Sequence, residues 1–181
     1  MKLRGEQLKR LAEKAGVSVE QLGEAVARTG LDGDRAVSAV RNWMDGRDHP
    51  RCKSQDLAKL AAAVGVQPKD IARFTSEVRY SRGSPRKAKL VTDLIKGKPY
   101  LEAENLLRFS TKRAAVNIRK ALNAAYADAQ LADADVERLY VAESRVDGGP
   151  IMKRFQPKDR GRAHRILKPM SHITVGIQER A

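Results

Sequence analysis

The chain has 181 residues, and its 36 lysines and arginines outnumber its 22 aspartates and glutamates, which gives a formal net charge of +14. A chain of this length forms one or two domains, and so large a positive charge predicts a phosphate-rich partner. Cys52 is the single cysteine, which excludes an internal disulfide and indicates a cytoplasmic protein. The sequence has neither an apolar run of membrane-spanning length nor a signal-peptide pattern, so we expect no membrane partner.

The positive charge is concentrated in the C-terminal part of the chain. Residues 1–76 carry 14 cations and 10 acids, whereas residues 77–181 carry 22 cations and 12 acids. Three scattered histidines and one cysteine give no metal-ligand spacing, since His49 and Cys52 lack further partners. No nucleophile and base pattern is present either, so we expect a protein without enzymatic activity, cofactor, metal or small-molecule substrate.

Residues 1–76 predict a small all-helical domain. Apolar positions recur at helical spacing over residues 3–15, 19–28, 34–44, 54–66 and 68–74. The stretches LGEAVARTGL, VSAVRNWMDGRDHP and DLAKLAAAVGV resemble the helix-turn-helix domains of the phage-repressor (Cro/C1) class. In that class the third helix enters the major groove, which implies nucleic-acid contacts by Arg35, Ser38, Arg41 and Asn42. Asp34 would face the phosphates, so a docking module that has lost base readout remains an equal alternative.

Residues 77–135 predict a strand followed by three helices. The strand covers residues 77–82, and a helix over 85–97 follows Ser84 as N-cap and Pro85 at its first position. A short helix opens at Pro99, and a longer one covers residues 111–130. The apolar spacing predicts that the inner faces of the three helices include Leu94, Leu106 and Ala114, respectively.

A long basic hairpin is predicted to close the chain. Strand-like runs cover residues 136–146 and 172–178, and pairing Leu139 with Ile177 would put the midpoint near residue 158. Each arm would have about 19 residues, or roughly 60 Å at ~3.3 Å per residue. Between the runs, residues 151–175 carry seven cations and one acid. Such an arm cannot bury itself, so we expect a polyanion outside the protein to order it; the alternative is a solvated basic loop.

Four motifs identify the C-terminal part. They are SPRK at 84–87, GP at 149–150, GRAHRI at 161–166 and SHITV at 171–175. With these motifs the stretch from about Val78 to Glu179 resembles the large-subunit ribosomal protein twenty-two family. The family begins near residue 77 of this sequence, so the resemblance implies that residues 1–76 are an added domain. It also implies a second domain of residues 77–181. In that domain the hairpin covers about 136–179, and its tip covers about 156–165.

The resemblance implies an α+β fold and a ribosomal role. We expect three helices on a small antiparallel sheet with a long protruding hairpin, joined to the all-α N-terminal domain. The implied partners are 23S rRNA, neighbouring large-subunit proteins and, at the hairpin, the nascent peptide in the exit tunnel. The rival hypothesis is a helix-turn-helix DNA-binding regulator whose basic C-terminal part clamps nucleic acid. The expected rRNA-binding residues are Arg82, Ser84, Arg86, Lys87, Lys112, Arg113, Arg119, Lys153, Arg154, Phe155, Lys158, Arg160, Gly161, Arg162, His164, Arg165, Lys168, Ser171 and His172.

Overall fold

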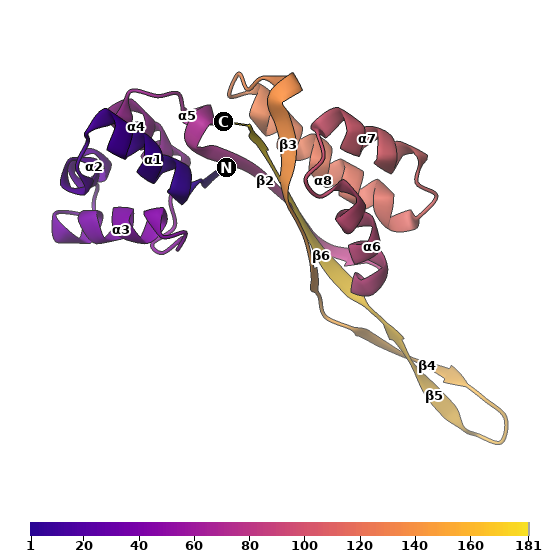
Figure 1. Ribbon diagram of the computed structural model, residues 1–181. Helices are drawn as coiled ribbons and strands as arrows, with labels where there is room; N and C mark the ends of the chain where they lie inside the picture. Colours follow the sequence, from indigo (N-terminus) through magenta and orange to yellow (C-terminus); the bar gives the residue numbers. More distant parts are fainter. Residues whose placement is uncertain (181) are drawn as a thin grey trace. The chain divides into compact units, whose positions relative to one another are not determined.

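The computed structural model describes residues 1–180 and shows an α+β protein with an antiparallel sheet. The chain divides into two compact units (Figure 1). Unit 1 comprises Met1–Phe74 with Ala132–Ala134, and unit 2 comprises Thr75–Leu131 with Asp135–Arg180. Strand β2 (Ala72–Arg82) begins in unit 1 and ends in unit 2, so the chain passes between the units without a separate linker.

Unit 1 is a helical unit around one small apolar core. Its elements are β1 (Lys2–Leu3), α1 (Gly5–Ala15), α2 (Val19–Val26), α3 (Asp34–Met44), α4 (Ser54–Val64) and α5 (Pro68–Ile71). Ser18 and Gln21 form a capping box at the start of α2, which fixes where that helix begins. Leu8, Leu22 and Leu60 come from three different helices and are completely buried, as amphipathic helices in a bundle require.

The predicted helix over residues 68–74 is wrong in its second half. Helix α5 ends at Ile71, and residues 72–74 already belong to β2, which is longer than the predicted strand over 77–82. The cause is a pairing with the start of the chain, because Lys2 and Leu3 of β1 lie opposite Arg73 and Ala72. A partner so distant in sequence leaves no trace in the local apolar pattern.

Unit 2 packs three helices against its sheet. After the end of β2 come α6 (Pro85–Ile95), α7 (Tyr100–Phe109), α8 (Arg113–Gln130), a 3-10 turn (Val136–Arg138), β3 (Leu139–Gly148), β4 (Met152–Pro157), β5 (Ala163–Lys168) and β6 (Met170–Glu179). The strand order is β1-β2-β6-β3, and β4 and β5 form a separate two-stranded ribbon. Helix α6 packs on β3 and α8 packs on β6, so that Ile118 of α8 and Ile173 of β6 are completely buried.

Three residues predicted on inner helix faces lie elsewhere. Leu94 is 52% exposed and Leu106 is 41% exposed. Ala115 takes the buried position predicted for Ala114, which is only half-buried. Because a helix advances 100° per residue, neighbouring positions straddle the edge of an apolar face, and only the packing partner decides which of them is covered. Thr92 of α6 is a polar residue that lies on the covered side of this edge. It is buried, and its hydroxyl donates to the Lys89 carbonyl.

The predicted hairpin register is wrong by two residues. Leu139 lies opposite Glu179, whereas Ile177 lies opposite Val141, and the register then shifts at a bulge between Val141 and Glu143. Because side chains alternate with a period of two, a slip of two residues keeps every apolar residue on its face, and the alternating pattern cannot detect it. Farther out, Pro157 pairs with Ala163, so the hairpin turns around Arg160 rather than residue 158.

Candidate nucleic-acid interface

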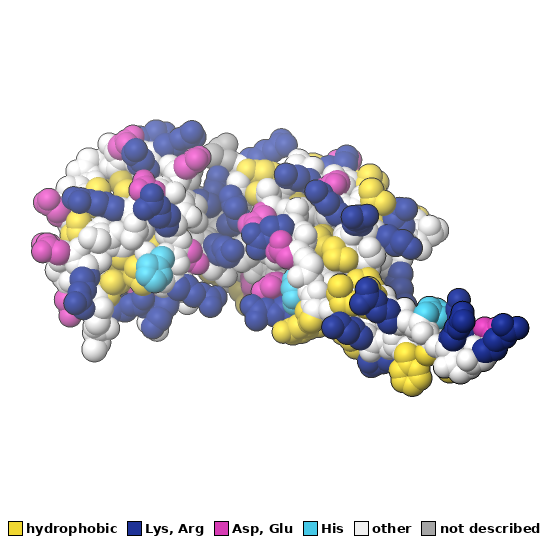
Figure 2. Space-filling view, turned by 90° about the horizontal axis from the view of Figure 1, so that it is seen from below, with side chains coloured by type: hydrophobic (Ala, Val, Ile, Leu, Met, Phe, Trp, Pro, Cys, Tyr) yellow, Lys and Arg dark blue, Asp and Glu magenta, His cyan; other side chains and the backbone are white. Residues whose placement is uncertain are grey.

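The outer ribbon of β4 and β5 carries cations on both faces. Directly opposed residues of an antiparallel pair share a face. Phe155 pairs with Arg165, and the neighbouring pair of Arg154 and Ile166 therefore points to the opposite side. Residues 153–165 are all exposed, and Phe155 is 76% exposed. Figure 2 shows lysine and arginine side chains gathered along this hairpin. Because the register puts cations on both faces, a polyanion can contact the ribbon from either side.

The hairpin tip is a tight turn whose two central residues have positive φ angles. Arg160 has φ +53° and Gly161 has φ +68°, which is the combination that type I′ hairpin turns use. The Lys158 amide donates to the Arg162 carbonyl at 2.6 Å, and the Arg162 amide donates to the Asp159 carbonyl at 3.1 Å. A glycine at 161 avoids the strain of a side chain at positive φ, and the turn spreads the tip cations around a compact end.

The ribbon is expected to exchange its amides quickly in the free protein. Its strands lie apart from the core formed by residues such as Ile173 and Ile177, and two-stranded ribbons are marginal in water. Hydrogen exchange of the free chain should therefore show weak protection over residues 153–167 and strong protection over 173–177. Bound rRNA should raise the protection of the ribbon, and equal protection of both segments in the free chain would contradict this expectation.

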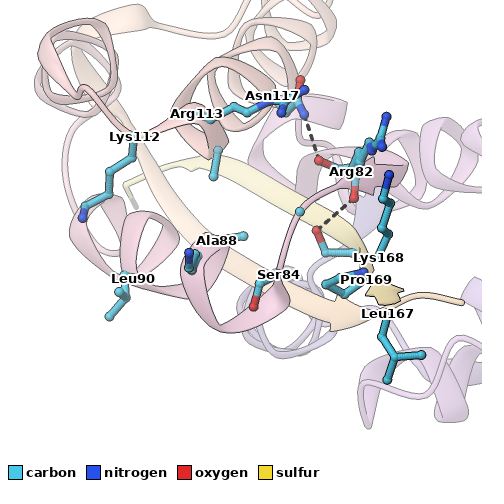
Figure 3. Close-up of a pocket in the computed structure, with 15 residues that line it drawn as sticks. Arg82, Ser84, Ala88, Leu90, Lys112, Arg113, Asn117, Leu167, Lys168 and Pro169 are labelled. Carbon is cyan, nitrogen blue, oxygen red and sulfur yellow. Dashed lines mark hydrogen bonds between the residues drawn. The ribbon is translucent and has the colours of Figure 1, made fainter. Parts of the chain in front are cut away.

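A second basic feature is a groove beside the base of the hairpin, which we call the basic groove. It encloses about 830 Å³ and is lined by residues from the end of β2, the starts of α6 and α8, and the end of β5 (Figure 3). Its lining contains no acidic residue and five cations, which are Arg82, Lys87, Lys112, Arg113 and Lys168. The cations come from separate elements that only the fold brings together, and their charges add in one concave site.

Two helix N-termini open into the basic groove. Helix α6 begins after Ser84, whose side chain accepts no capping hydrogen bond, and α8 begins after Lys112, whose side chain has no acceptor atom. The predicted N-cap position of Ser84 is thus correct, but its hydroxyl does not cap the helix. First-turn amides and the helix dipole attract anions, so the groove combines side-chain cations with backbone donors suited to phosphate.

The structure places the expected rRNA-binding residues in two groups and leaves some outside both. Arg86 and Arg119 lie on α6 and α8 but do not line the basic groove, and His172 lies on β6. The basic groove contains Arg82, Ser84, Lys87, Lys112, Arg113, Lys168 and Ser171. The outer ribbon and its turn contain Lys153, Arg154, Phe155, Lys158, Arg160, Gly161, Arg162, His164 and Arg165.

Two of these residues hold strands together. Ser171 is 1% exposed, and its hydroxyl donates to the Ser81 carbonyl at 3.4 Å. The His172 Nδ1 atom accepts from the Tyr80 amide at 3.2 Å, where Tyr80 has φ +55°. Both side chains therefore link β6 to β2 by hydrogen bonds. Asn117, which the sequence analysis missed, lines the groove and donates to the Ser81 hydroxyl at 2.8 Å.

On the third helix of unit 1 only part of the predicted contact face is available. Arg35, Ser38 and Arg41 are exposed on α3. Asn42 is half-buried, and its side-chain amide donates to the His49 carbonyl at 3.1 Å, so it fixes the loop after α3. Asp34 is exposed in the first turn of α3, where its charge opposes a phosphate at that helix end.

The part of the chain that the structure describes offers neither a metal cluster nor a reactive thiol. Residues 1–180 contain no group of three or more histidine, cysteine, aspartate or glutamate side chains placed to hold a metal ion. Burial, reinforced by Asp56 and Asp48, raises the pKa of Cys52 to about 12, so this thiol stays protonated at neutral pH. Within the same residues no helix has the length and apolar character to cross a membrane.

The basic groove and the two-sided cationic ribbon have the phosphate-recognition chemistry that is typical of nucleic-acid-binding proteins. The family to which the chain belongs is ribosomal protein L22p/L17e, whose model matches residues 76–178. This match confirms the resemblance of the stretch from about Val78 to Glu179 to the ribosomal protein family. The matched region begins within β2, next to the boundary between the units. Family membership makes the chain a structural ribosomal protein and not an enzyme.

Curated relatives agree with the family match. The large ribosomal subunit protein uL22 of Syntrophotalea carbinolica is 48% identical over 106 residues, which cover 58% of this chain and 96% of that protein. The uL22 protein of Geobacter sulfurreducens is 45% identical over 107 residues, covering 59% and 96%. That of Caldicellulosiruptor saccharolyticus is 44% identical over 112 residues, covering 61% and 92%. Each relative is thus covered almost completely by little more than half of this chain.

Proposed function

We propose that the chain binds 23S rRNA through the basic groove and the outer ribbon of unit 2. As a family member it is a structural constituent of the large ribosomal subunit, which assembles with rRNA and other large-subunit proteins. The observation that carries the proposal is the groove with five cations, no acid and two helix N-termini. Phosphate contacts supply most nucleic-acid affinity, and arginine adds bidentate contacts and stacking on bases.

The outer ribbon is proposed to line the nascent-peptide exit tunnel. Its two-sided charge suits a segment that passes between rRNA helices, because RNA can then contact both faces. Phe155, exposed and opposite Arg165, can stack on an unpaired base. The compact turn at Arg160 and Gly161 leaves a blunt end that can reach the tunnel wall and face the peptide.

A photo-crosslinker placed at residue 160 tests this proposal directly. In ribosomes that carry a stalled nascent chain, the Arg160 variant is expected to form crosslinks with the peptide, because the tip would lie at the tunnel wall. A crosslinker at Lys120, exposed on α8, serves as the control and should give only rRNA or protein crosslinks. Peptide crosslinks from both positions, or from neither, would argue against the tunnel placement.

Unit 1 is proposed to dock on rRNA or a neighbouring protein at the solvent side of the subunit rather than to regulate transcription. Unit 1 and unit 2 are joined within β2, so docking of unit 2 confines unit 1 to a small volume of high local rRNA concentration. Exposed Arg35 and Arg41 on α3 can contact backbone phosphates without reading sequence.

Replacing Arg35 and Arg41 together with alanine should release unit 1 from this site in a salt-dependent manner. Protease accessibility of residues 45–53 in assembled subunits should rise, while protection of the ribbon stays unchanged, because only unit 1 loses phosphate contacts. Lys9 and Lys14, exposed on α1, provide a control pair with the same change in charge. If residues 1–76 alone prefer one duplex DNA site strongly over random sequence, the DNA-binding regulator becomes the better explanation.

A further inference from the structure

The lining of the basic groove includes apolar residues beside its cations. Ala88, Leu90 and Ala114 line it from the two helices, and Leu167 and Pro169 line it from the hairpin base. Leu90 is 59% exposed. An RNA duplex backbone presents phosphates and sugars, which satisfy the cations but leave this apolar surface against water. Apolar surface of this kind is stabilised only by an apolar or aromatic group.

We propose that the basic groove holds one unpaired nucleotide that is extruded from the rRNA. Its base would lie against the apolar lining residues, and its flanking phosphates would lie at the starts of α6 and α8 among Lys87, Lys112 and Arg113. The inference rests on the proposed rRNA binding and names the part of the RNA that this site takes. Proteins read extruded bases by stacking them against apolar or aromatic side chains in such pockets.

The volume and the polar wall of the groove fit this occupant. About 830 Å³ is within the range of sites that bind small ligands, so the space is larger than a phosphate contact needs. Asn117 stands at the wall with its amide nitrogen fixed by the Ser81 hydroxyl at 2.8 Å. That bond leaves the Asn117 side-chain carbonyl to accept a hydrogen bond from the amino or imino edge of a base.

The charge of the groove favours RNA as the occupant. A nucleotide step brings phosphates on both sides of its base, and the cations of the groove come from two helices and two strand ends beside its apolar residues. The two uncapped helix N-termini add backbone donors, which suit phosphate oxygens. An acidic, partly apolar peptide is the competing occupant, and the experiment below separates the two.

The test compares two RNA probes that carry equal charge. Both are short RNA hairpins with a single-nucleotide bulge in the stem. The first carries a base at the bulged nucleotide, and the four bases are tested in turn. The second carries an abasic ribose at the same position. The full-length chain is expected to bind the base-containing bulge about tenfold more tightly than the abasic bulge, a difference of ~1.4 kcal/mol. Leu90→Ser should remove most of this preference and leave affinity for the abasic probe unchanged.

Leu94→Ser provides the matched control, because Leu94 lies on the same helix, is 52% exposed and does not line the groove. It should leave the preference for the base-containing bulge intact. Equal affinity of the wild-type chain for both probes would overturn the nucleotide assignment while leaving rRNA binding in place. Weak binding of both probes together with no binding to 23S rRNA would instead overturn the proposed function. Tighter binding of a glutamate-rich amphipathic peptide, weakened by Leu90→Ser, would assign the groove to a protein and overturn the inference.

Discussion

Replacing Lys87, Lys112 and Arg113 together with glutamine is expected to weaken binding to 23S rRNA on the order of a hundredfold at physiological salt. The three side chains line one groove that contains no acid, so each is available to neutralise a phosphate. Each phosphate contact contributes a slope of about 0.7–0.9 in the dependence of log affinity on log salt. Removing three contacts therefore lowers affinity by about two orders of magnitude near 0.15 M salt.

A salt titration separates this mechanism from a general loss of charge. The slope of log affinity against log salt should fall by roughly two to three in the triple variant. Lys96, Arg108 and Lys120 are exposed and do not line the groove, so their replacement with glutamine changes net charge equally. That control should lose much less affinity and retain most of the slope. Equal losses of affinity in both variants would mean that the groove has no special role. The chain would then attract RNA only through the electrostatic field of its net charge.

Part of the interface could be predicted from the sequence because it is local. The cations of residues 153–165 lie within one segment, and the turn residues around Gly161 mark where that segment reverses. Alternating apolar residues such as Ile173 and Ile177 identify β6 and its buried face. The register could not be predicted, because a slip of two residues preserves the apolar pattern and the bulge after Val141 then moves the following residues of β3 to the opposite faces.

The basic groove illustrates what local patterns miss. Its members Arg82, Lys112 and Lys168 are far apart in sequence and meet only where β2, α8 and β5 converge. Most of its cations were singled out through the family resemblance, which supplied the residues but not their arrangement. Asn117 was missed because one polar residue in an amphipathic helix carries no signal until its partner Ser81 is known. Ser171 is predicted as an rRNA contact, and the structure adds a role in strand pairing, since the residue is buried and its hydroxyl donates to the Ser81 carbonyl.

In unit 1 the helices were predictable, whereas their purpose was not. Apolar spacing located α1–α4 to within a few residues. The end of α5 depended on the pairing of β1 with β2 and was missed. The helix-turn-helix resemblance rests mainly on apolar spacing, and the exposed Asp34 weakens the match to a helix that reads bases. Its likeness to a DNA-binding domain therefore remains a prediction.

Trp43→Ala is expected to destabilise unit 1 selectively. Trp43 is 3% exposed, and its indole nitrogen donates to the Pro50 carbonyl, which ties the loop after α3 to the core. Removing a buried tryptophan costs about 3–5 kcal/mol, and the Pro50 carbonyl also loses its donor. For a unit that spans Met1–Phe74, typical stabilities of ~0.05–0.15 kcal/mol per residue give roughly 4–11 kcal/mol in total. The substitution therefore removes a large part of the stability of unit 1.

Calorimetry of the full-length chain can assign the loss to one unit. If the two cores are independent, the Trp43→Ala variant loses or shifts one unfolding transition, and the transition of unit 2 keeps its midpoint. Trp43→Phe retains an aromatic ring and should shift the same transition by less. A chain that lacks residues 1–74 should still unfold in one cooperative transition. Affinity for 23S rRNA through the basic groove should change little in the Trp43 variants, because every residue that lines the groove lies in unit 2. A single transition that moves as a whole would show instead that the buried residues of both units form one cooperative core, and that unit 1 stabilises unit 2.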